Sequence, residues 1–138
     1  MSENSLNTEF EMQARVQKSF AEATQKKVEN HQALNDDEIK LLCPVAFKDK
    51  MTKAEIRKLG LSKHYSFVPT MNVVNDLRAL GYEVVDAKQV KARKKSTNGY
   101  QKHMLTFEHP KYKVEGREEY PQILLTNSHD GGNAFTLS

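Results

Sequence analysis

The chain has 138 residues, a formal net charge of +3, a single cysteine and 38% hydrophobic residues. A chain of this length fits one domain that can bury roughly two-thirds of its unfolded surface. The lone cysteine, Cys43, excludes an internal disulfide framework and a multi-cysteine zinc site, and we expect it to be a small buried hydrophobe. No apolar run approaches the roughly 20 residues of a membrane span, and the polar, acidic N-terminus is unlike a signal peptide. We therefore expect a cytoplasmic protein with no membrane partner.

The N-terminal segment, residues 1–33, is predicted to hold a polar stretch and one amphipathic helix. Residues 1 to 9 offer little that could pack and are expected to be disordered. From Phe10 to Asn30 the sequence lacks Gly and Pro and is rich in helix-forming residues. The helix has a thin apolar stripe, which we expect to pack within the domain; the alternative is docking on a protein partner. The stripe consists of Met12, Val16, Phe20 and Ala23.

Capping pairs predict the next two elements. Asn35 with Glu38 predicts a short helix that ends before Pro44, and Thr52 with Glu55 predicts a second one. In each pair the first side chain accepts the backbone N–H of the residue three positions later. The carboxylate of that later residue in turn accepts the backbone N–H of the first.

A strand and a third helix are predicted to follow. His64 to Val68 alternates polar and apolar residues as strands do. Thr70 is expected to cap a helix that Gly81 ends. The apolar residues of this helix recur at helical spacing: Val73, Val74, Leu77 and Leu80.

After Gly81 the apolar spacing becomes alternating. Tyr82 to Ala92 and Tyr100 to Glu108 predict two strands, joined at an Asn98-Gly99 hairpin turn. Beyond a charged loop, Gln122 to Asn127 and Ala134 to Leu137 predict two more. The order predicts an α+β fold in which N-terminal helices precede a helix packed on an antiparallel meander, with residues 34–138 as a single domain.

The predicted hairpin is strongly basic. Between Ala87 and Phe107 there are six basic residues and no acidic residue. Because the net charge of the whole chain is +3, the remaining residues carry a net charge of −3. Concentrated positive charge attracts polyanions, and an aromatic side chain beside it can stack on an unpaired base. The alternative is an ordinary solvated loop. The predicted nucleic-acid contacts are Lys88, Lys91, Arg93, Lys94, Lys95, Tyr100 and Lys102.

A polar turn, Asn127 to Asp130, follows the strand from Gln122. Side chains in such a turn can be presented to a partner by a rigid scaffold, but the same residue types also serve turn formation alone. A zinc, manganese or iron ion could be held by His103, His129 and Asp130, with His64 as a fourth candidate ligand. Asn127 could orient these ligands through hydrogen bonds. The alternative for His103 is a packed histidine, because it shares a strand face with Leu105 and Phe107.

Covalent catalysis and cofactor binding have little support in the sequence. Ser128 and His129 are adjacent in the chain, so their side chains diverge and do not form a nucleophile–base pair. Phosphate-cradling glycine motifs do not occur. We expect no cofactor and a protein that is not an enzyme.

Three ordered motifs resemble one known family: His64-Tyr65-x-Phe67-Val68-Pro69-Thr70, Lys102-His103-Met104 and Leu124-Leu125-x-Asn127-Ser128-His129-Asp130-Gly131. They resemble the phage- and plasmid-related proteins grouped as domain of unknown function 932, and the stretch from Asp37 to Phe47 is similar to that family's lead-in. The resemblance runs from about residue 34 to the C-terminus. It implies residence on mobile elements and no settled biochemical activity. Relatives look longer, so we expect a short version lacking a C-terminal continuation.

Together these observations predict a phage or plasmid accessory protein that binds nucleic acid or a host nucleoprotein complex. The resemblance leads us to expect interference with host defence, as an anti-CRISPR-like inhibitor. One alternative is a single-stranded DNA binding or annealing helper in the element's own replication or recombination. A second is a metal-dependent enzyme. The sequence does not indicate an oligomeric state.

Overall fold

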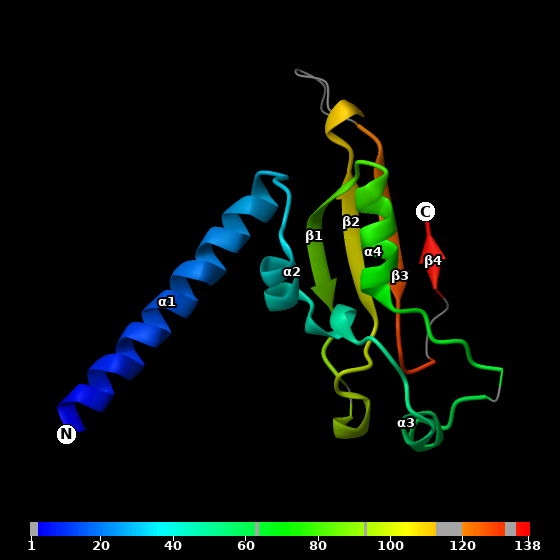
Figure 1. Cartoon of the computed structure of the whole chain (residues 1–138), viewed down its shortest axis with the longest axis horizontal. Helices are drawn as coiled ribbons and strands as arrows, with labels where there is room; N and C mark the ends of the chain where they lie inside the picture. The colour runs from blue at the N-terminus through cyan, green and yellow to red at the C-terminus, as the bar shows by residue number, and fades with distance from the viewer. Residues whose placement is uncertain (1–2, 63, 93, 113–119, 132–134) are drawn as a thin grey trace.

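The computed structural model describes residues 3–62, 64–92, 94–112, 120–131 and 135–138, with side chains from Thr8 onward. Helices come first and a sheet follows, which confirms the α+β class (Figure 1). The elements are α1 (Glu3–Glu29), α2 (Asp36–Leu42), the 3-10 helix η1 (Pro44–Phe47), α3 (Lys53–Lys58), α4 (Thr70–Ala79), β1 (Glu83–Gln89), the 3-10 helix η2 (Lys95–Thr97), β2 (His103–Glu108), the 3-10 helix η3 (Pro110–Tyr112), β3 (Gln122–Asn127) and β4 (Thr136–Leu137).

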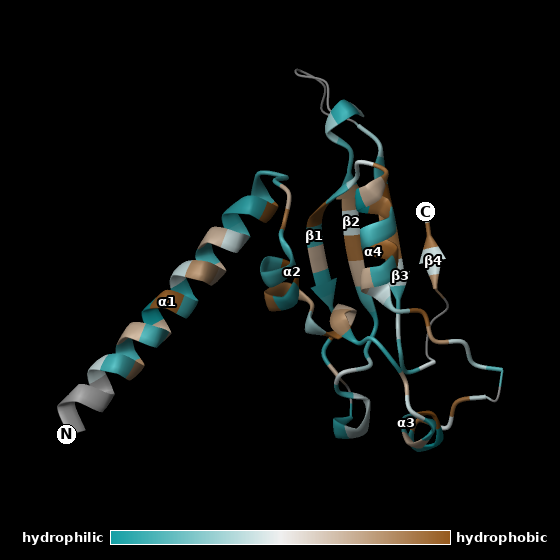
Figure 2. Ribbon diagram, in the orientation of Figure 1, coloured by the Kyte–Doolittle hydropathy of each residue, from teal (hydrophilic) through white to brown (hydrophobic). Residues whose placement is uncertain are grey.

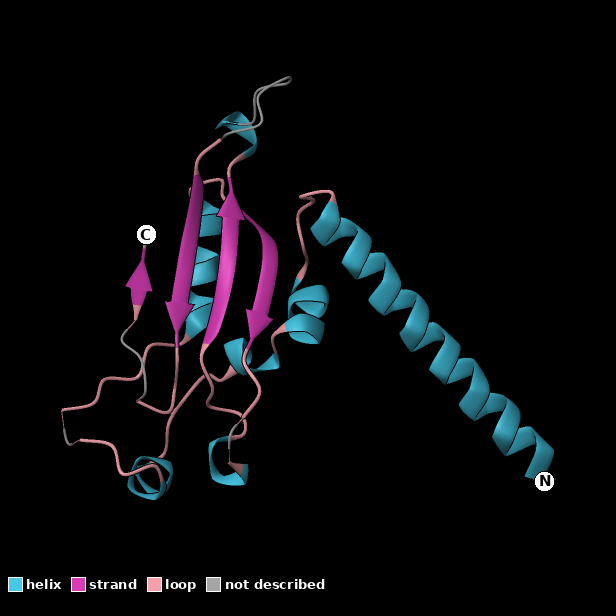
Figure 3. Ribbon diagram, turned by 180° about the vertical axis from the view of Figure 1, so that it is seen from behind, coloured by secondary structure: helices cyan, strands magenta, loops and turns pink. Residues whose placement is uncertain are grey.

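The strands form an antiparallel meander in the order β1-β2-β3-β4, as predicted. The register sets His103 opposite Asn127 and Leu105 opposite Leu125, so these four side chains lie on the same face. That face is covered by α4, whereas no described helix lies over the opposite face, which Figure 3 views directly. The sheet therefore has one face in the core and one face towards solvent.

The core lies between α4, the segment from α2 to η1, and the covered face of the sheet. Figure 2 shows hydrophobic colour concentrated on α4 and the strands. Cys43 is fully buried there, and burial raises the pKa of its thiol to about 12, so it is an unreactive hydrophobe, as expected. The buried apolar side chains that contact one another in this core are Leu34, Ile39, Cys43, Val45, Ala46, Val74, Leu77, Val84, Ala87, Leu105, Phe107 and Leu125.

Both predicted capping pairs are present. The Asn35 side chain accepts the Glu38 N–H at 2.9 Å, and the Glu38 carboxylate accepts the Asn35 N–H at 2.9 Å. Thr52 and Glu55 make the same reciprocal pair at the start of α3. Each pair satisfies backbone donors that the first turn of a helix leaves without partners.

α1 differs from expectation at its start and in its packing. The helix begins at Glu3, so the expected disorder of residues 1 to 9 is wrong for the part described. Met12 is 59%, Val16 67% and Phe20 36% exposed, so the expectation that this stripe packs within the domain is also wrong. The physical reason is that α4, α2 and η1 already fill the covered sheet face, and α1 projects away from it (Figure 1). No helix of the described residues is long and apolar enough to span a membrane.

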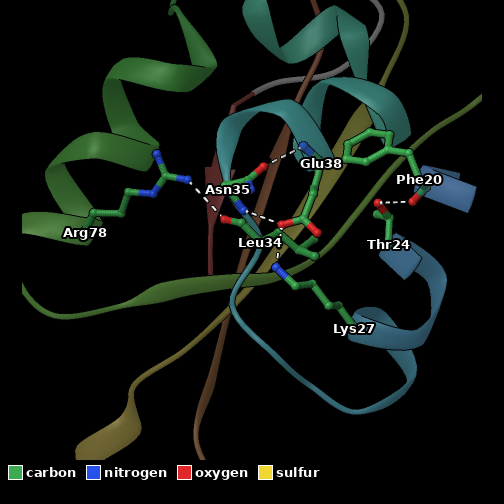
Figure 4. A network of polar contacts seen from close by, with 7 residues as sticks. All are labelled: Phe20, Thr24, Lys27, Leu34, Asn35, Glu38 and Arg78. Atoms are coloured by element: carbon green, nitrogen blue, oxygen red, sulfur yellow. Dashed lines mark hydrogen bonds and ion pairs between the residues drawn. The ribbon is translucent and has the colours of Figure 1, made fainter. Parts of the chain in front are cut away.

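Near the C-terminal end of α1, described side chains turn towards the rest of the chain. Thr24 is fully buried and its hydroxyl donates to the Phe20 carbonyl at 2.8 Å. The Lys27 ammonium forms an ion pair with Glu38 at 2.8 Å (Figure 4). Beyond the helix, the Leu34 N–H donates to the Val84 carbonyl at 2.8 Å, which occupies part of the free edge of β1.

Three local expectations are wrong. The segment from His64 to Val68 is not a strand: the Tyr65 N–H donates to the Ser62 carbonyl in a local turn, and the Val68 carbonyl accepts from the Asn127 side chain instead of a neighbouring strand. Pro69, not Thr70, is the N-cap of α4, and the Thr70 hydroxyl is directed into the core instead. The strands β1 and β2 are shorter than predicted, since their pairing ends at Gln89 opposite His103.

The connection between these strands is longer than a two-residue hairpin. One further bond, from the Val90 N–H to the Lys102 carbonyl at 3.0 Å, extends the ladder before the chains separate. Gly99 adopts a φ of 97°, as a glycine turn requires, but within a wide loop that also contains η2. We name residues 88–102, with the basic side chains they carry, the basic loop.

Candidate functional site: a buried polar network and a basic loop

The three segments that carry the family motifs meet at one end of the covered sheet face. Thr70 begins α4, His103 begins β2 and Asn127 ends β3. His103 and Asn127 are register partners, and Thr70 lies against both of them. All three side chains are buried, so the sequence motifs converge on a single network.

The hydrogen bonds of this network fix the direction of each proton. The His103 Nδ1 lies 3.0 Å from the Gln101 carbonyl, which can only accept, so Nδ1 carries the proton. Nε2 then accepts from the Thr70 hydroxyl at 2.6 Å. The Thr70 oxygen in turn accepts from Asn127 Nδ2 at 3.1 Å. Burial lowers the pKa of His103, which favours this neutral tautomer.

Asn127 joins the network to the segment that precedes α4. Its Nδ2 donates to the Val68 carbonyl at 2.9 Å, and its Oδ1 accepts the Ser128 N–H at 2.9 Å. The Asn127 side chain therefore supplies the Val68 carbonyl with the hydrogen bond that a neighbouring strand would otherwise give. A buried amide with this many partners stabilises one arrangement of the surrounding backbone.

His129 lies beside the network but is bound differently. Its backbone N–H donates to the Tyr100 carbonyl at 2.8 Å, while neither ring nitrogen makes a hydrogen bond within the described part of the chain. The ring packs against Phe67 and His103, with centroids 4.8 and 5.1 Å away. Burial, and then the neighbouring His103, lower the pKa of His129 to about 4; the nearby Val45 carbonyl opposes this shift without reaching hydrogen-bond geometry.

The network has the composition of a catalytic site but not its accessibility. Thr70, His103 and His129 are each at most 1% exposed, so no substrate reaches the hydroxyl–imidazole pair. Among the described residues, no three His, Cys, Asp or Glu side chains are grouped to hold a metal ion. His64, the fourth metal candidate, is exposed, and Asp130 is half-buried. This arrangement suits a structural role for Asn127, Ser128 and His129 in the polar turn.

The described lysines of the basic loop are exposed. The described loop lysines, Lys88, Lys91, Lys94, Lys95 and Lys102, are all exposed, and none forms an ion pair with a described carboxylate. Arg93, the remaining basic residue of the predicted contact set, is outside the described residues. These lysines therefore present positive charge that no described carboxylate neutralises.

Part of the loop surrounds an open hollow of about 540 Å³. Lys91, Lys94 and Lys95 line it, and the amides of Gln89, Asn98 and Gln101 complete it. A second hollow, next to η1, shares Gln89 and Asn98 and adds Lys48. Sequence reasoning missed Lys48 and the three amides, because they carry no local signal and come together only through the fold.

Tyr100 is already occupied within the protein. Its hydroxyl donates to Glu55 Oε2 at 2.6 Å, and the Lys48 ammonium lies 4.8 Å from its ring centroid. Hydrogen bonds from Lys48 and Tyr100 lower the pKa of Glu55 to about 2, and the Glu55 hydrogen bond raises the pKa of Tyr100. A base that stacked on the face of this ring next to Lys48 would have to displace Lys48.

Comparison with known proteins identifies a family match that contains the three motifs. The chain belongs to the family described as domain of unknown function (DUF932), whose sequence model matches residues 60–138. That match contains all three motifs, while the stretch from Asp37 to Phe47 lies outside it.

Two relatives come from Escherichia coli strain K12: UPF0380 protein YafZ and UPF0380 protein YfjQ, each 29% identical over 79 residues. The aligned part covers 55% of this chain and 27% of each relative, so the chain spans about a quarter of their length. No solved structure matches the chain significantly.

Proposed function

We propose that the protein binds the phosphate backbone of nucleic acid through its basic loop. The observation that carries the proposal is the set of exposed lysines around an open hollow, none of which pairs with a carboxylate of the described residues. Ammonium groups that are not neutralised within the protein release counterions when they meet phosphates, and this release drives binding.

Backbone contact is favoured over base stacking. Three lysines and three amides line the hollow, and such groups suit phosphate oxygens. Tyr100, the aromatic group of the region, is bound by Glu55 and covered by Lys48. These contacts favour sequence-independent binding and speak against an annealing helper that would rely on stacking.

The biological setting of the proposal comes from the family. Residence on a phage or plasmid, action in the host cytoplasm, and an anti-CRISPR-like interference with host defence rest on the resemblance alone. A host nucleoprotein complex would offer the loop the same phosphates as free nucleic acid. These finer statements stay predictions.

Salt-dependent binding tests the proposal. Fluorescence anisotropy with labelled duplex and single-stranded oligonucleotides, measured from 50 to 200 mM salt, should show log affinity falling linearly with log salt. The variant Lys91→Gln/Lys94→Gln/Lys95→Gln should reduce the slope by up to about 2.7 on duplex DNA, since each lost phosphate contact removes about 0.9.

A charge-matched control separates the loop from net charge. Lys18→Gln/Lys26→Gln/Lys50→Gln removes the same three charges from exposed positions elsewhere. It should leave the slope close to that of the wild type. Equal loss in both triple variants, or affinity that is indifferent to salt, would contradict binding by the loop.

A further inference from the structure

The hollow inside the basic loop has no acidic side chain among the described residues that line it. It lies in the connection that follows β1 (Figure 1). Lys91, Lys94 and Lys95 contribute its cationic lining, and an ammonium group donates hydrogen bonds but accepts none. A lining of this kind attracts an anion and repels a cation.

Two amides of the hollow are held in a fixed orientation by the backbone. The Gln101 Oε1 accepts the Gly99 N–H at 2.7 Å, and the Gln89 Oε1 accepts the Val45 N–H at 3.2 Å. A backbone N–H can only donate, so each amide oxygen faces it and each NH₂ group points elsewhere. Neither NH₂ group makes a hydrogen bond within the described part of the chain.

Gln101 is the buried member of this lining. Its side chain is part of a residue that is only 5% exposed, whereas the three lysines are exposed. The lysines therefore form the rim of the hollow, and Gln101 forms its floor. A nearly buried donor without a hydrogen bond is costly to the fold, and a ligand that accepts from it recovers this cost.

We infer that the hollow takes the terminal phosphate of a nucleotide, which is a phosphate monoester. The inference rests on the proposed binding of nucleic acid by the basic loop, and it names which phosphate the hollow receives. A monoester carries a charge of about −1.5 to −2 at pH 7 and has three free oxygens. A phosphodiester within a strand carries a single charge and has two free oxygens. Three ammonium groups and two oriented amides therefore match the monoester better.

The position of Gln101 at the floor also favours an end group. A phosphodiester that reached Gln101 would require the strand to enter and to leave past the same lysines. A terminal phosphate has the chain on one side alone, so it can reach the floor through a single opening.

The neighbouring hollow beside η1 provides space for the nucleoside that carries this phosphate. It has a volume of about 440 Å³ and shares Gln89 and Asn98 with the first hollow. Pro44 and Phe47 give it apolar lining, and Lys48 adds a cation. Apolar surface beside a few directed polar groups is typical of a site for a small organic ligand, and it suits the sugar and the base.

Fluorescence anisotropy tests the inference with internally labelled single strands of one sequence. The strands carry a 5′-phosphate, a 3′-phosphate or hydroxyls at both ends. At pH 7.5 and 150 mM salt, at least one phosphorylated strand should bind about tenfold more tightly than the strand with hydroxyl ends. Equal, salt-dependent affinity of all three would overturn this inference and leave backbone binding intact. Binding of none of them would contradict the proposed function as well.

Gln101→Glu tests the floor of the hollow. The new carboxylate can still accept the Gly99 N–H, but it puts a negative charge in place of the NH₂ donor. The preference for the phosphorylated strand should fall close to onefold. Gln32→Glu makes the same change of charge at an exposed position and should keep the preference. A folded Gln101→Glu variant with the full preference would overturn the inference.

Asn98→Asp repeats this test without risk to the core. Asn98 lines both hollows and is exposed, and its side chain makes no hydrogen bond within the described residues. The preference should again fall, because the new carboxylate repels the phosphate monoester. An undiminished preference in both Asn98→Asp and Gln101→Glu would exclude the hollow as the phosphate site.

Competition with AMP and adenosine separates two sources of the same chemistry. Displacement of the labelled phosphorylated strand by AMP, but not by adenosine, would show that a free nucleotide fills the hollow. Displacement by an unlabelled phosphorylated strand, but not by AMP, would assign the hollow to the ends of strands. If an unlabelled strand with hydroxyl ends competed as well as the phosphorylated one, the terminal phosphate would not be recognised.

Discussion

At the scale of single residues, His129 is the most constrained group in the molecule. It has no exposed surface, and its ring contacts Phe67 and His103 rather than water. A protonated imidazole in this position would be a buried charge beside His103 and Lys48, which the Val45 carbonyl and Asp130 offset only in part. Folding therefore requires the neutral form, and this requirement links stability to pH.

We predict that stability is lost as the pH falls from about 6.5 to 4. The pKa of His129 is about 4 in the folded protein against an ordinary 6.5, so the unfolded chain binds the proton more tightly in this window. The free energy of unfolding should drop by up to about 3 kcal/mol from this group, at 1.36 kcal/mol per pKa unit. Above pH 6.5 the His129 ring is neutral in both the folded and the unfolded state, so it no longer makes the free energy of unfolding depend on pH.

Urea unfolding of wild type and His129→Asn at pH 7, 6, 5 and 4 measures this effect. The variant should be less stable at pH 7 but should lose less stability on acidification. His64→Asn, at an exposed histidine, serves as the control and should follow the wild type. Parallel curves for His129→Asn and wild type would show that His129 does not carry the pH dependence.

At the scale of elements, Glu38 connects α1 with α2, and the neighbouring Leu34 links this region to α4. Glu38 closes the capping box of α2 and pairs with Lys27 of α1, while the neighbouring Leu34 carbonyl accepts from Arg78 of α4 at 3.3 Å (Figure 4). Although burial alone would raise its pKa, the hydrogen bonds from Asn35 and Lys27 outweigh burial and lower the pKa of Glu38. The carboxylate thus stabilises the fold above its ordinary pKa, and this stability is lost as the pH falls through the lowered value.

Substitution of Glu38 should separate its two contacts. Glu38→Ala removes both and should cost about 2 kcal/mol at pH 7, combining a lost cap with a lost charged hydrogen bond. Glu38→Gln can still close the capping box, so it should cost less while weakening the hold on Lys27. Hydrogen exchange at the end of α1 should rise in both variants.

Asp37→Ala is the control for this prediction. Asp37 occupies the same first turn of α2 but is exposed. It should change stability by less than Glu38→Ala, because only a helix-dipole contribution is lost. If the two alanine variants were equally stable, the Glu38 contacts would contribute nothing.

Elements whose signals are local were predicted from the sequence. The two capping boxes depend on residues three positions apart, and β3 has the predicted bounds from Gln122 to Asn127. The segment from His64 to Val68 was mistaken for a strand, because its alternation does not reveal that Asn127, 59 positions from Val68, takes up its carbonyl. Pattern reasoning also had no means to predict that the Thr70 hydroxyl would bind His103 instead of capping α4.

At the scale of the whole molecule, the family match and the folding unit differ in extent. Residues 60–138 contain the sheet and α4, but Leu34, Ile39, Cys43, Val45 and Ala46 also belong to the core and precede the match. These side chains cover the same face of the sheet as α4. The domain boundary expected at residue 34 stays a prediction, although Lys27 and His31 bind Glu38 and Glu108 across it.

We predict that residues 30–138 fold alone and that residues 60–138 do not. The shorter fragment lacks five buried apolar side chains and would expose the apolar surface they cover. Far-UV circular dichroism with urea titration should give a cooperative transition for residues 30–138 only. A cooperative transition of residues 60–138 would show that the helices before residue 60 are not needed for the core.

The overall class could be predicted from the sequence because helical and alternating patterns occupy separate halves of the chain. The site could be predicted only in part. The six-residue concentration of positive charge was visible, but the hollow of Lys91, Lys94 and Lys95 with distant amides was not. The projection of α1 away from the sheet was also not predicted, because an apolar stripe does not by itself reveal whether the rest of the domain has room for it.

The polar network has a consequence for the order of events in folding. Thr70 binds His103 and Asn127 across 33 and 57 positions of the chain, so loop closure must precede both bonds. We expect both bonds to form after the rate-limiting barrier, so that their loss would shorten the lifetime of the native state while leaving its rate of formation nearly unchanged. The three motifs would then govern how long the assembled domain persists.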